Sequence, residues 1–175
     1  MKKTNCFLSL GLGIIVLITS CQPKIDIEKE KAAVKVVLQD ETAAYIAMDI
    51  DKISTYYVQD EFNTRLQQLC SEELPIYSGW NKVKSYLESG MKVNNPEYKN
   101  IKNLKDGFII KIKDNCAWVV NKDIWTWENN NIQIRGEGLQ TTFMEKIDGS
   151  WKISMMSYFY RGPSDSTPKD TTTVK

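Results

Sequence analysis

DGSWKI, residues 148–153, lies near the end of the stretch that decides the fold, Gly107–Tyr160. This stretch predicts four successive antiparallel strands and opens with GFIIKIK, in which apolar and basic residues alternate as they do along a half-buried strand. An Asp-Gly pair supplies the positive φ that a tight hairpin turn needs. We therefore expect Ile132–Ile147 and Trp151–Tyr160 to pair as a hairpin.

The same alternation assigns side chains to faces. One side of the last strand is predicted to hold Trp151, Ile153, Met155, Ser157 and Phe159. The strand 117–127 differs because both of its faces carry apolar residues, with Asn121, Asp123 and Trp125 on one face and Trp118 on the other. A sheet covered on one side only would alternate more cleanly, so a second layer or a partner subunit is expected on the far side. Tyr158 and Tyr160 are expected on the outer face with Trp118, either as plain surface or as a dimer seam.

Three helices are predicted before these strands, at Glu28–Met48, Asp51–Tyr57 and Trp80–Met91. Residues 61–70 fit either a short strand or a helical turn, 71–79 a loop, and 92–106 a polar connection. Residues 161–175, rich in proline and threonine, predict a disordered tail. Helices followed by antiparallel strands indicate an α+β domain over 28–160.

The N-terminus predicts a targeting signal over residues 1–20, because Met1-Lys2-Lys3 precedes a short apolar run. Its end, Leu17-Ile18-Thr19-Ser20-Cys21, resembles the lipobox of bacterial lipoproteins, in which the cysteine is acylated, for example with palmitate. The resemblance implies a lipid on Cys21, a tether over 21–27, and a membrane partner at the cell envelope, the outer membrane of a Gram-negative bacterium. An ordinary secretory signal with an incidental cysteine is the alternative.

The net charge and the cysteine content limit which partners and metal ions the chain is expected to bind. The chain has 23 basic and 22 acidic residues, and loss of Lys2 and Lys3 with the signal leaves a net charge of about −1. This balance gives no reason to expect nucleic acid as a partner.

Cys70 and Cys116 remain in the mature chain, either bridged or as two separately buried thiols. A metal site is not expected, because histidine is absent and the thiols have no partner at ligand spacing; no cofactor is expected either.

Several segments together resemble the nuclear-transport-factor-2-like superfamily, also called SnoaL-like. They are Ala47–Ile53 followed by Tyr56-Tyr57 and Asp60, Gly79-Trp80 at the start of a helix, and Gly138–Lys146 with the DGSWKI hairpin. The resemblance covers about Glu28–Tyr160 and implies a cone-shaped fold in which three N-terminal helices pack on a curved antiparallel sheet. Family members often carry histidine shortly after the hairpin tryptophan, where Met155 and Ser157 stand here.

A pocket inside such a cone would take side chains from the helix stripe and the strand faces. The predicted wall consists of Tyr45, Tyr56, Trp80, Asn121, Trp125, Thr142 and Ser157 around Asp123.

Two functions are compatible with such a pocket. The first is a non-catalytic envelope lipoprotein that binds a small apolar ligand or another protein, with a homodimer formed through the sheet. The second is an isomerase, cyclase or dehydratase with a pocket carboxylate, Asp123, as general base, since no histidine can take that role. A carboxyl group that titrates above about pH 6 would favour the enzyme, whereas a solvated aspartate would not.

Overall fold

The computed structural model describes residues 26–69, 75–92 and 98–168, with side chains described for the same ranges except 68–69, 92 and 161–168. The helices are α1 (Ile27–Ile46), α2 (Ile50–Ser54) and α3 (Trp80–Lys92). The strands are β1 (Thr64–Leu69), β2 (Ile76–Ser78), β3 (Lys99–Lys113), β4 (Cys116–Asn129), β5 (Ile132–Ile147) and β6 (Ser150–Pro168). The predicted signal peptide, lipid site at Cys21 and Cys70 lie outside the described residues.

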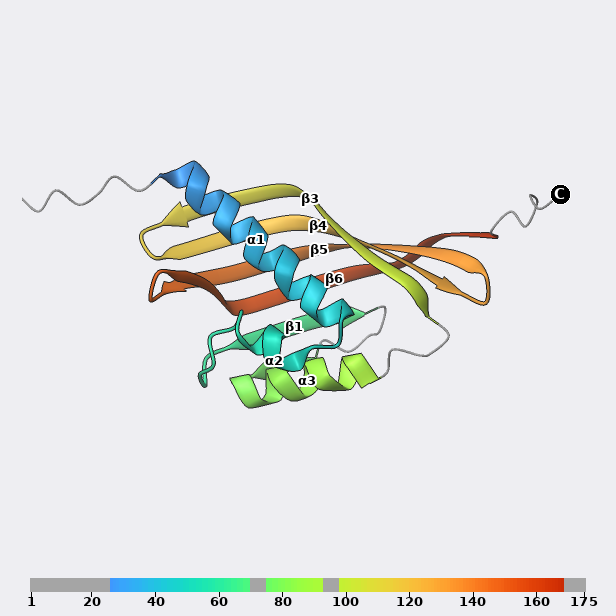
Figure 1. Ribbon diagram of the computed structural model, residues 1–175, viewed down its shortest axis with the longest axis horizontal. Coiled ribbons are helices and arrows are strands. Elements are labelled where there is room, and N and C mark those ends of the chain that lie inside the picture. Colours follow the sequence, from blue (N-terminus) through green and yellow to red (C-terminus); the bar gives the residue numbers. More distant parts are fainter. Residues whose placement is uncertain (1–25, 70–74, 93–97, 169–175) are drawn as a thin grey trace, which may run out of the picture.

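One sheet of six strands forms the body of the molecule, in the order β2-β1-β6-β5-β4-β3. The strands β3 to β6 are antiparallel neighbours, as the sequence predicted, and only the β1–β6 pair is parallel. Figure 1 shows α1 lying obliquely across one face of the sheet, with α3 beside β1 at one edge. The domain is therefore α+β, and the three helices of the described residues lie on the same side of the sheet.

In the N-terminal half the strand alternative for residues 61–70 is confirmed, whereas the predicted loop, 71–79, was wrong at its end because it contains β2. Residues 61–70, which fitted a strand or a helical turn, contain β1, and β1 and β2 form a hairpin between α2 and α3. The expected order of three helices followed by the sheet is therefore interrupted. β1 reaches the main sheet by pairing with β6, about ninety residues away in sequence, which no local pattern reveals.

Two expectations about the connections were wrong. The predicted polar connection, 92–106, contributes the first half of β3 from Lys99, with Leu104 59% exposed. The backbone of β6 continues to Pro168 and stays paired with β5, with register shifts around Gly136, where the sequence predicted a disordered tail from Arg161; the rest of that predicted tail, 169–175, lies outside the described residues. Paired strands satisfy their backbone N–H and C=O groups across the ladder, so polar side chains are tolerated there.

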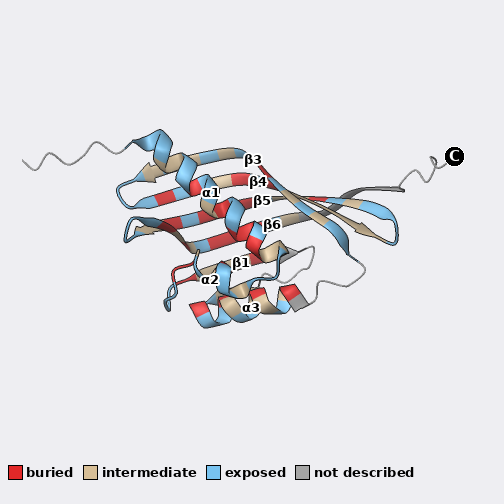
Figure 2. Cartoon of the chain, in the orientation of Figure 1, coloured by how far each residue is buried: buried red, intermediate tan, exposed pale blue. Residues whose placement is uncertain are grey.

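α1 forms the cover of the core. Asp26 caps its first turn by accepting from the Lys29 backbone N–H at 3.1 Å. Val34 and Leu38 are completely buried against the sheet, each contributing about 1.5–3 kcal/mol of apolar burial. Figure 2 shows the buried residues concentrated along the strands and helix faces that meet beneath α1.

An ion pair fastens the start of α1 to the β5–β6 hairpin. The Glu30 carboxylate accepts from Lys146 Nζ at 2.6 Å and from the indole Nε1 of Trp151 at 2.7 Å. The hydrogen bonds from Lys146 and Trp151 lower the pKa of Glu30. Through Lys146 and Trp151, the predicted DGSWKI hairpin therefore also positions the helix that covers the sheet. At the turn of this hairpin Asp148 and Gly149 both have positive φ, as predicted.

A β-bulge at Ser154 changes which side chains of β6 face α1. Phe143 pairs with Met155 and Met144 with Ile153, so Ser154 has no opposite residue. The inner face therefore holds Ile153 and then Met156. The predicted set that continued through Met155, Ser157 and Phe159 is wrong beyond Ile153, because one extra residue reverses the alternation.

A second bulge lies in β3 at Gly107, where Asp106 pairs with Lys122 and Ile109 with Val120. Gly107 has φ +61°, a conformation that glycine adopts without steric cost. The predicted apolar face of Phe108, Ile110 and Ile112 packs against the core, as expected. The bulge also turns Lys105 toward that same face, where it is only 7% exposed.

Candidate functional site: an aromatic pocket with two polar clusters

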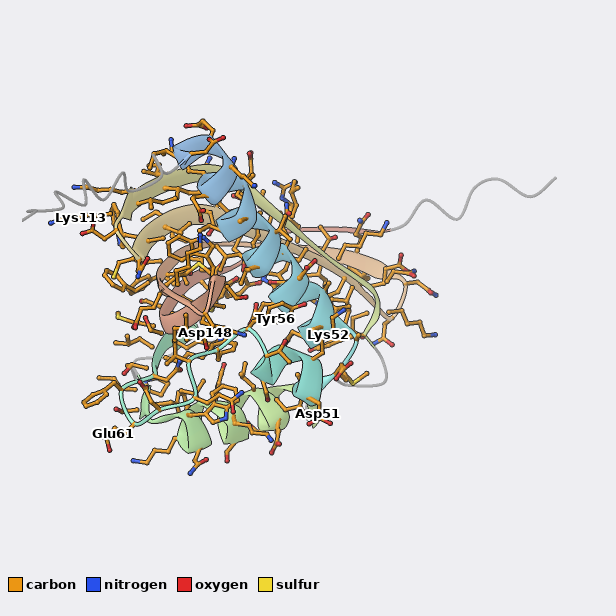
Figure 3. All side chains as sticks on the ribbon, turned by 60° about the vertical axis from the view of Figure 1, so that its left-hand side comes forward. Asp51, Lys52, Tyr56, Glu61, Lys113 and Asp148 are labelled. Atoms are coloured by element: carbon orange, nitrogen blue, oxygen red, sulfur yellow. The ribbon has the colours of Figure 1, made fainter. Side chains whose placement is uncertain are left out.

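A pocket of about 450 Å³ lies between α1, α3 and the inner face of the sheet. Its helical side is formed by Glu41, Thr42, Tyr45, Ile46 and, from α3, Tyr86. Its sheet side, together with Tyr98, is formed by Arg65, Gln67, Ile101, Lys105, Asp123, Trp125, Trp127, Gln140, Met156, Tyr158 and Tyr160. Most of this surface is aromatic or aliphatic. The charged groups are few: Glu41, Lys105 and Asp123 are buried, and Arg65 is partly buried. Figure 3 shows side chains from the helices and from the sheet directed into the space between these two layers.

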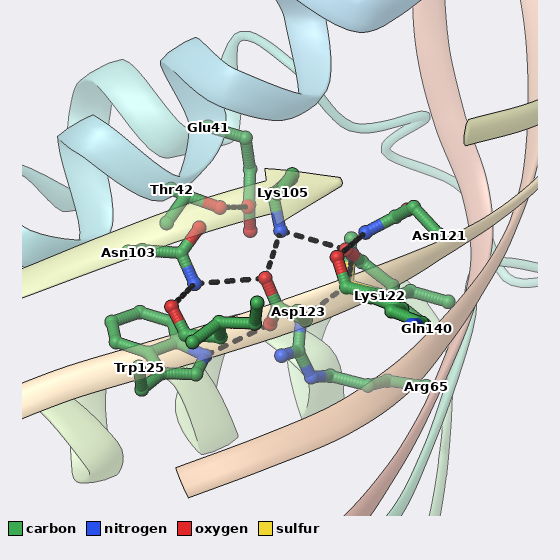
Figure 4. A network of polar contacts seen from close by, with 12 residues as sticks. Glu41, Thr42, Arg65, Asn103, Lys105, Asn121, Lys122, Asp123, Trp125 and Gln140 are labelled. Atoms are coloured by element: carbon green, nitrogen blue, oxygen red, sulfur yellow. Dashed lines mark hydrogen bonds and ion pairs between the residues drawn. The ribbon is translucent and has the colours of Figure 1, made fainter. Parts of the chain in front are cut away.

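The first polar cluster is organised by Asp123. Its Oδ1 accepts from Lys105 Nζ at 2.9 Å and from Asn103 Nδ2 at 2.8 Å, and its Oδ2 accepts from Trp125 Nε1 at 2.8 Å. Lys105 Nζ also donates to Gln140 Oε1 at 2.7 Å. The side chains of Lys105 and Asp123 are 2% and 4% exposed, so this is a buried ion pair with its charges matched (Figure 4).

The second cluster connects α1 to β1 through a tyrosine. Tyr57 Oη donates to Glu41 Oε1 at 2.8 Å and accepts from Arg65 Nη1 at 3.0 Å. Glu41, only 4% exposed, also accepts from the Thr42 hydroxyl at 3.2 Å. Arg65 Nη1 lies 3.3 Å from Met156 Sδ, and its guanidinium lies over the Tyr86 ring at 5.5 Å. Carboxylate, phenol and guanidinium thus form one row, of which Glu41 and Arg65 line the pocket.

Burial sets the protonation states in this second cluster. Desolvation raises the pKa of Tyr57, and the neighbouring Glu41 carboxylate raises it further. Desolvation also raises the pKa of Tyr86 to about 12, although the charge of Arg65 opposes the shift. For Arg65, burial lowers the pKa, but Tyr57 and Glu41 outweigh it and the net direction is upward. The tyrosines are neutral and Arg65 is a cation at neutral pH.

Close backbone approaches shape the pocket wall at two glycines. A Cβ on Gly138 of β5 would lie 2.6 Å from the Phe159 carbonyl oxygen and 3.1 Å from the Tyr158 ring. A Cβ on Gly90 of α3 would lie 2.7 Å from the Tyr45 hydroxyl. Both contacts are shorter than side chains tolerate, so glycine at these positions lets Tyr158 and Tyr45 lie where they line the pocket.

The predicted site residues are only partly brought together. Tyr45, Asp123 and Trp125 line the pocket. Asn121 and Thr142 are buried but do not line the pocket; Asn121 Nδ2 lies 3.4 Å from Oε1 of Gln140, which does.

Three predicted ligand contacts lie elsewhere. Tyr56, labelled beside α2 in Figure 3, packs against the hydrophobic core. Trp80 stacks on Tyr57 with ring centroids 5.4 Å apart. Ser157 pairs with Thr141 on the outer face because of the Ser154 bulge.

Sequence reasoning missed the charged groups of the site other than Asp123. Glu41 could have been found, because a charged residue that interrupts the apolar stripe of the first helix indicates a buried polar contact. Lys105 had a weaker signal, the Asp-Gly pair that follows it and forms the bulge. Arg65 had none, because β1 joins the sheet through a non-local pairing. Tyr158 was expected outside and instead lines the pocket.

The described residues show no built metal site and no spanning helix. Within 26–69, 75–92 and 98–168, no group of three or more Cys, Asp or Glu side chains is placed to hold a metal ion. No helix in the described part of the chain is long and apolar enough to cross a membrane. Cys116 has a free, exposed thiol at the start of β4.

Comparison with known proteins rests on structure alone. No protein-family model matches the chain, and no curated protein matches it in sequence. An NTF-2-like protein of unknown function from Shewanella oneidensis superposes with a TM-score of 0.55 at 18% identity, covering 74% of this chain and 98% of that one. A putative scytalone dehydratase from Novosphingobium aromaticivorans gives 0.61 at 14% identity, covering 82% and 90%.

A third structure, a hexachlorocyclohexane dehydrochlorinase from Novosphingobium barchaimii, superposes with a TM-score of 0.62 at 12% identity. The match covers 86% of this chain and 98% of that one. At such identities the likeness concerns the course of the backbone, and the side chains of the pocket must be read from this chain itself. The chain has the nuclear-transport-factor-2-like fold that the hairpin and helix segments of its sequence resemble.

Proposed function

We propose that the protein is a cell-envelope lipoprotein whose pocket binds a small amphipathic molecule without converting it. The observation that carries this proposal is the aromatic pocket of about 450 Å³, a size typical of small-ligand sites. Its polar groups are few and fixed in place, since Asp123 accepts from three donors and its oxygens are already engaged. Such a wall orients a ligand more readily than it exchanges protons with one.

The neutral fluorescent probe N-phenyl-1-naphthylamine tests whether the pocket accepts an apolar body. We expect one molecule to bind per chain, and Ile101→Trp, which adds a ring to the pocket wall, to weaken binding about tenfold or more. Leu104→Trp is the matched control, because Leu104 lies on the same strand but faces outward and is 59% exposed. A fluorescence titration that shows no binding by the unaltered protein, or equal losses in both variants, contradicts the proposal.

The lipid anchor is proposed from the lipobox-like sequence that ends in Cys21. Two or more acyl chains hold a protein at a bilayer for long times, whereas an unacylated chain is released. We expect Cys21→Ala to move the protein from the membrane fraction to the soluble fraction after cell lysis, as measured by immunoblotting. If the variant stays with membranes that have been washed with high salt, the anchor lies elsewhere.

A second candidate, an isomerase, cyclase or dehydratase, is favoured by the row formed by Glu41, Tyr57 and Arg65. The Glu41 carboxylate could accept a proton from a substrate while the Arg65 guanidinium stabilises developing negative charge, with Tyr57 joining the two from behind the pocket wall. The solved structures described as a putative dehydratase and a dehydrochlorinase support this class. Identification by mass of a co-purifying molecule, followed by incubation with fresh protein, separates the two: conversion that Glu41→Gln abolishes would establish the enzyme.

We also propose that two copies associate through the outer face of the sheet, which carries a row of exposed apolar side chains. The row contains Ile109, Trp118, Leu139, Phe143 and Phe159, between 42% and 62% exposed. Apolar residues gathered in this way on a sheet are typical of a protein interface.

A further inference from the structure

Arg65 is the charged group of the pocket whose hydrogen bonds are least complete. A guanidinium has five N–H donors in a planar fork. The bonds to Tyr57 Oη and Met156 Sδ both come from Nη1. Nε is buried and, within the described part of the chain, has no acceptor. The edge of the guanidinium that carries Nε therefore has donor capacity that the protein does not use.

The charge of Arg65 is also the one without a direct ionic partner. Lys105, the other cation of the pocket, is 2.9 Å from Asp123. Among the described residues no carboxylate lies within 4.0 Å of the Arg65 guanidinium, and Glu41 is reached only through the Tyr57 hydroxyl. Arg65 is partly buried, and a cation withdrawn from water is costly unless an anion and hydrogen bonds compensate it. An anionic group on a ligand would supply both.

The remainder of the pocket favours a flat apolar body. Tyr45 meets Trp125 edge to face with ring centroids 6.3 Å apart, and the Tyr158 and Tyr160 rings are stacked at 6.3 Å. Aromatic walls of this kind prefer aromatic or fused-ring partners. Trp127 adds a buried indole Nε1–H that lacks an acceptor among the described groups and is free to donate to a ligand oxygen.

We propose, on the basis of the ligand-binding function above, that the ligand is a planar apolar molecule with one carboxylate group, which pairs with the Arg65 guanidinium. A carboxylate matches the planar fork with two parallel N–H···O bonds. A phosphate monoester would bring about two negative charges close to the carboxylates of Glu41 and Asp123, which disfavours it. The ring system would lie among the tyrosines and tryptophans of the wall.

Three naphthalene probes of equal size test the charge of the ligand: 2-naphthoate, 2-naphthamide and 2-naphthylmethylammonium. Their binding is followed by quenching of tryptophan fluorescence and by calorimetry. We expect 2-naphthoate to bind about tenfold or more tightly than the neutral amide, and the ammonium probe to bind most weakly, because a charge-assisted hydrogen bond is worth a factor of this order.

Variants of arginine then assign the preference to one residue. Arg65→Met is expected to remove the preference for 2-naphthoate over 2-naphthamide, whereas Arg135→Met is expected to keep it, since Arg135 is an exposed arginine paired with Glu137. If Arg65→Met does not fold, Arg65→Lys retains a charge but not the fork, and should reduce the preference. A preference unchanged in whichever Arg65 variant folds overturns the proposal.

The outcomes separate this inference from the function on which it rests. Equal or tighter binding of 2-naphthamide by the unaltered protein overturns the carboxylate proposal. If N-phenyl-1-naphthylamine still binds in that case, the small-molecule pocket stands. If neither that probe nor any naphthalene derivative binds, both proposals fail together.

Discussion

Asp123→Leu is expected to destabilise the fold by about 3–5 kcal/mol, because it leaves the Lys105 ammonium buried without a counterion. Both side chains of this pair are at most 4% exposed, so solvent provides little screening. Lys105→Met, which removes the other partner, is expected to cost a similar amount. Urea denaturation with an unchanged slope measures the change in the free energy of unfolding.

The double variant Lys105→Met with Asp123→Leu serves as the control for this pair. Because both charges are absent, we expect it to be more stable than either single variant, with a coupling of about 2 kcal/mol or more. Asn103 and Trp125 lose an acceptor in the double variant, so some destabilisation should remain. Two single-variant losses that simply add would show that Lys105 and Asp123 do not act as a unit.

This expected result bears on the role of Asp123. A general base must have a free lone pair within reach of the proton that it takes. Here both carboxylate oxygens accept from protein donors, and the acceptors and donors come from β3 and β4. We infer that Asp123 mainly holds the pocket floor together. Glu41 also accepts on both oxygens, but from two neutral hydroxyl donors and no cation, so more of its acceptor capacity is left for any chemistry.

The strands and helices that repeat a simple period could be predicted from the sequence. The Asp-Gly turn fixed the β5–β6 hairpin, and the 3.6-residue stripe of α1 placed Leu38 against the sheet. The assignment of faces in β4 is also confirmed, since Asn121 and Asp123 are buried on the inner side while Trp118 is exposed on the other. These features depend only on residues close together in the chain.

The composition of the site could not be predicted in the same way. One extra residue at Ser154 exchanges Ser157 for Tyr158 at the pocket, and the bulge at Gly107 brings Lys105 inward. A bulge is selected by the curvature of the whole sheet, and a period-two pattern cannot reveal its position. Arg65 reaches the pocket because β1 pairs in parallel with β6, a strand far away in the sequence. This pairing depends on tertiary packing.

The outer face of the sheet offers the second large expected effect. The side chains of Trp118 and Phe143 lie opposite each other on β4 and β5 and are 42% and 43% exposed. α1 covers only the other face, so within the described residues nothing of the chain covers this pair. A twofold contact would bring each residue close to its own copy or to its neighbour, which makes the patch self-complementary.

Trp118→Glu is therefore expected to weaken self-association about a hundredfold or more, because it removes a central aromatic side chain and places a carboxylate on each side of an apolar contact. Sedimentation equilibrium of the mature domain without its lipid measures the change. Val36→Glu is the matched control: Val36 is an apolar residue of α1 with 52% exposure, on the opposite side of the molecule, and this variant should associate as the unaltered protein does. A monomeric unaltered protein at high micromolar concentration would contradict the proposed dimer. Because the pocket opens on the other face, ligand binding should survive Trp118→Glu, so a common loss of dimer and ligand would show that the two faces are coupled through β4.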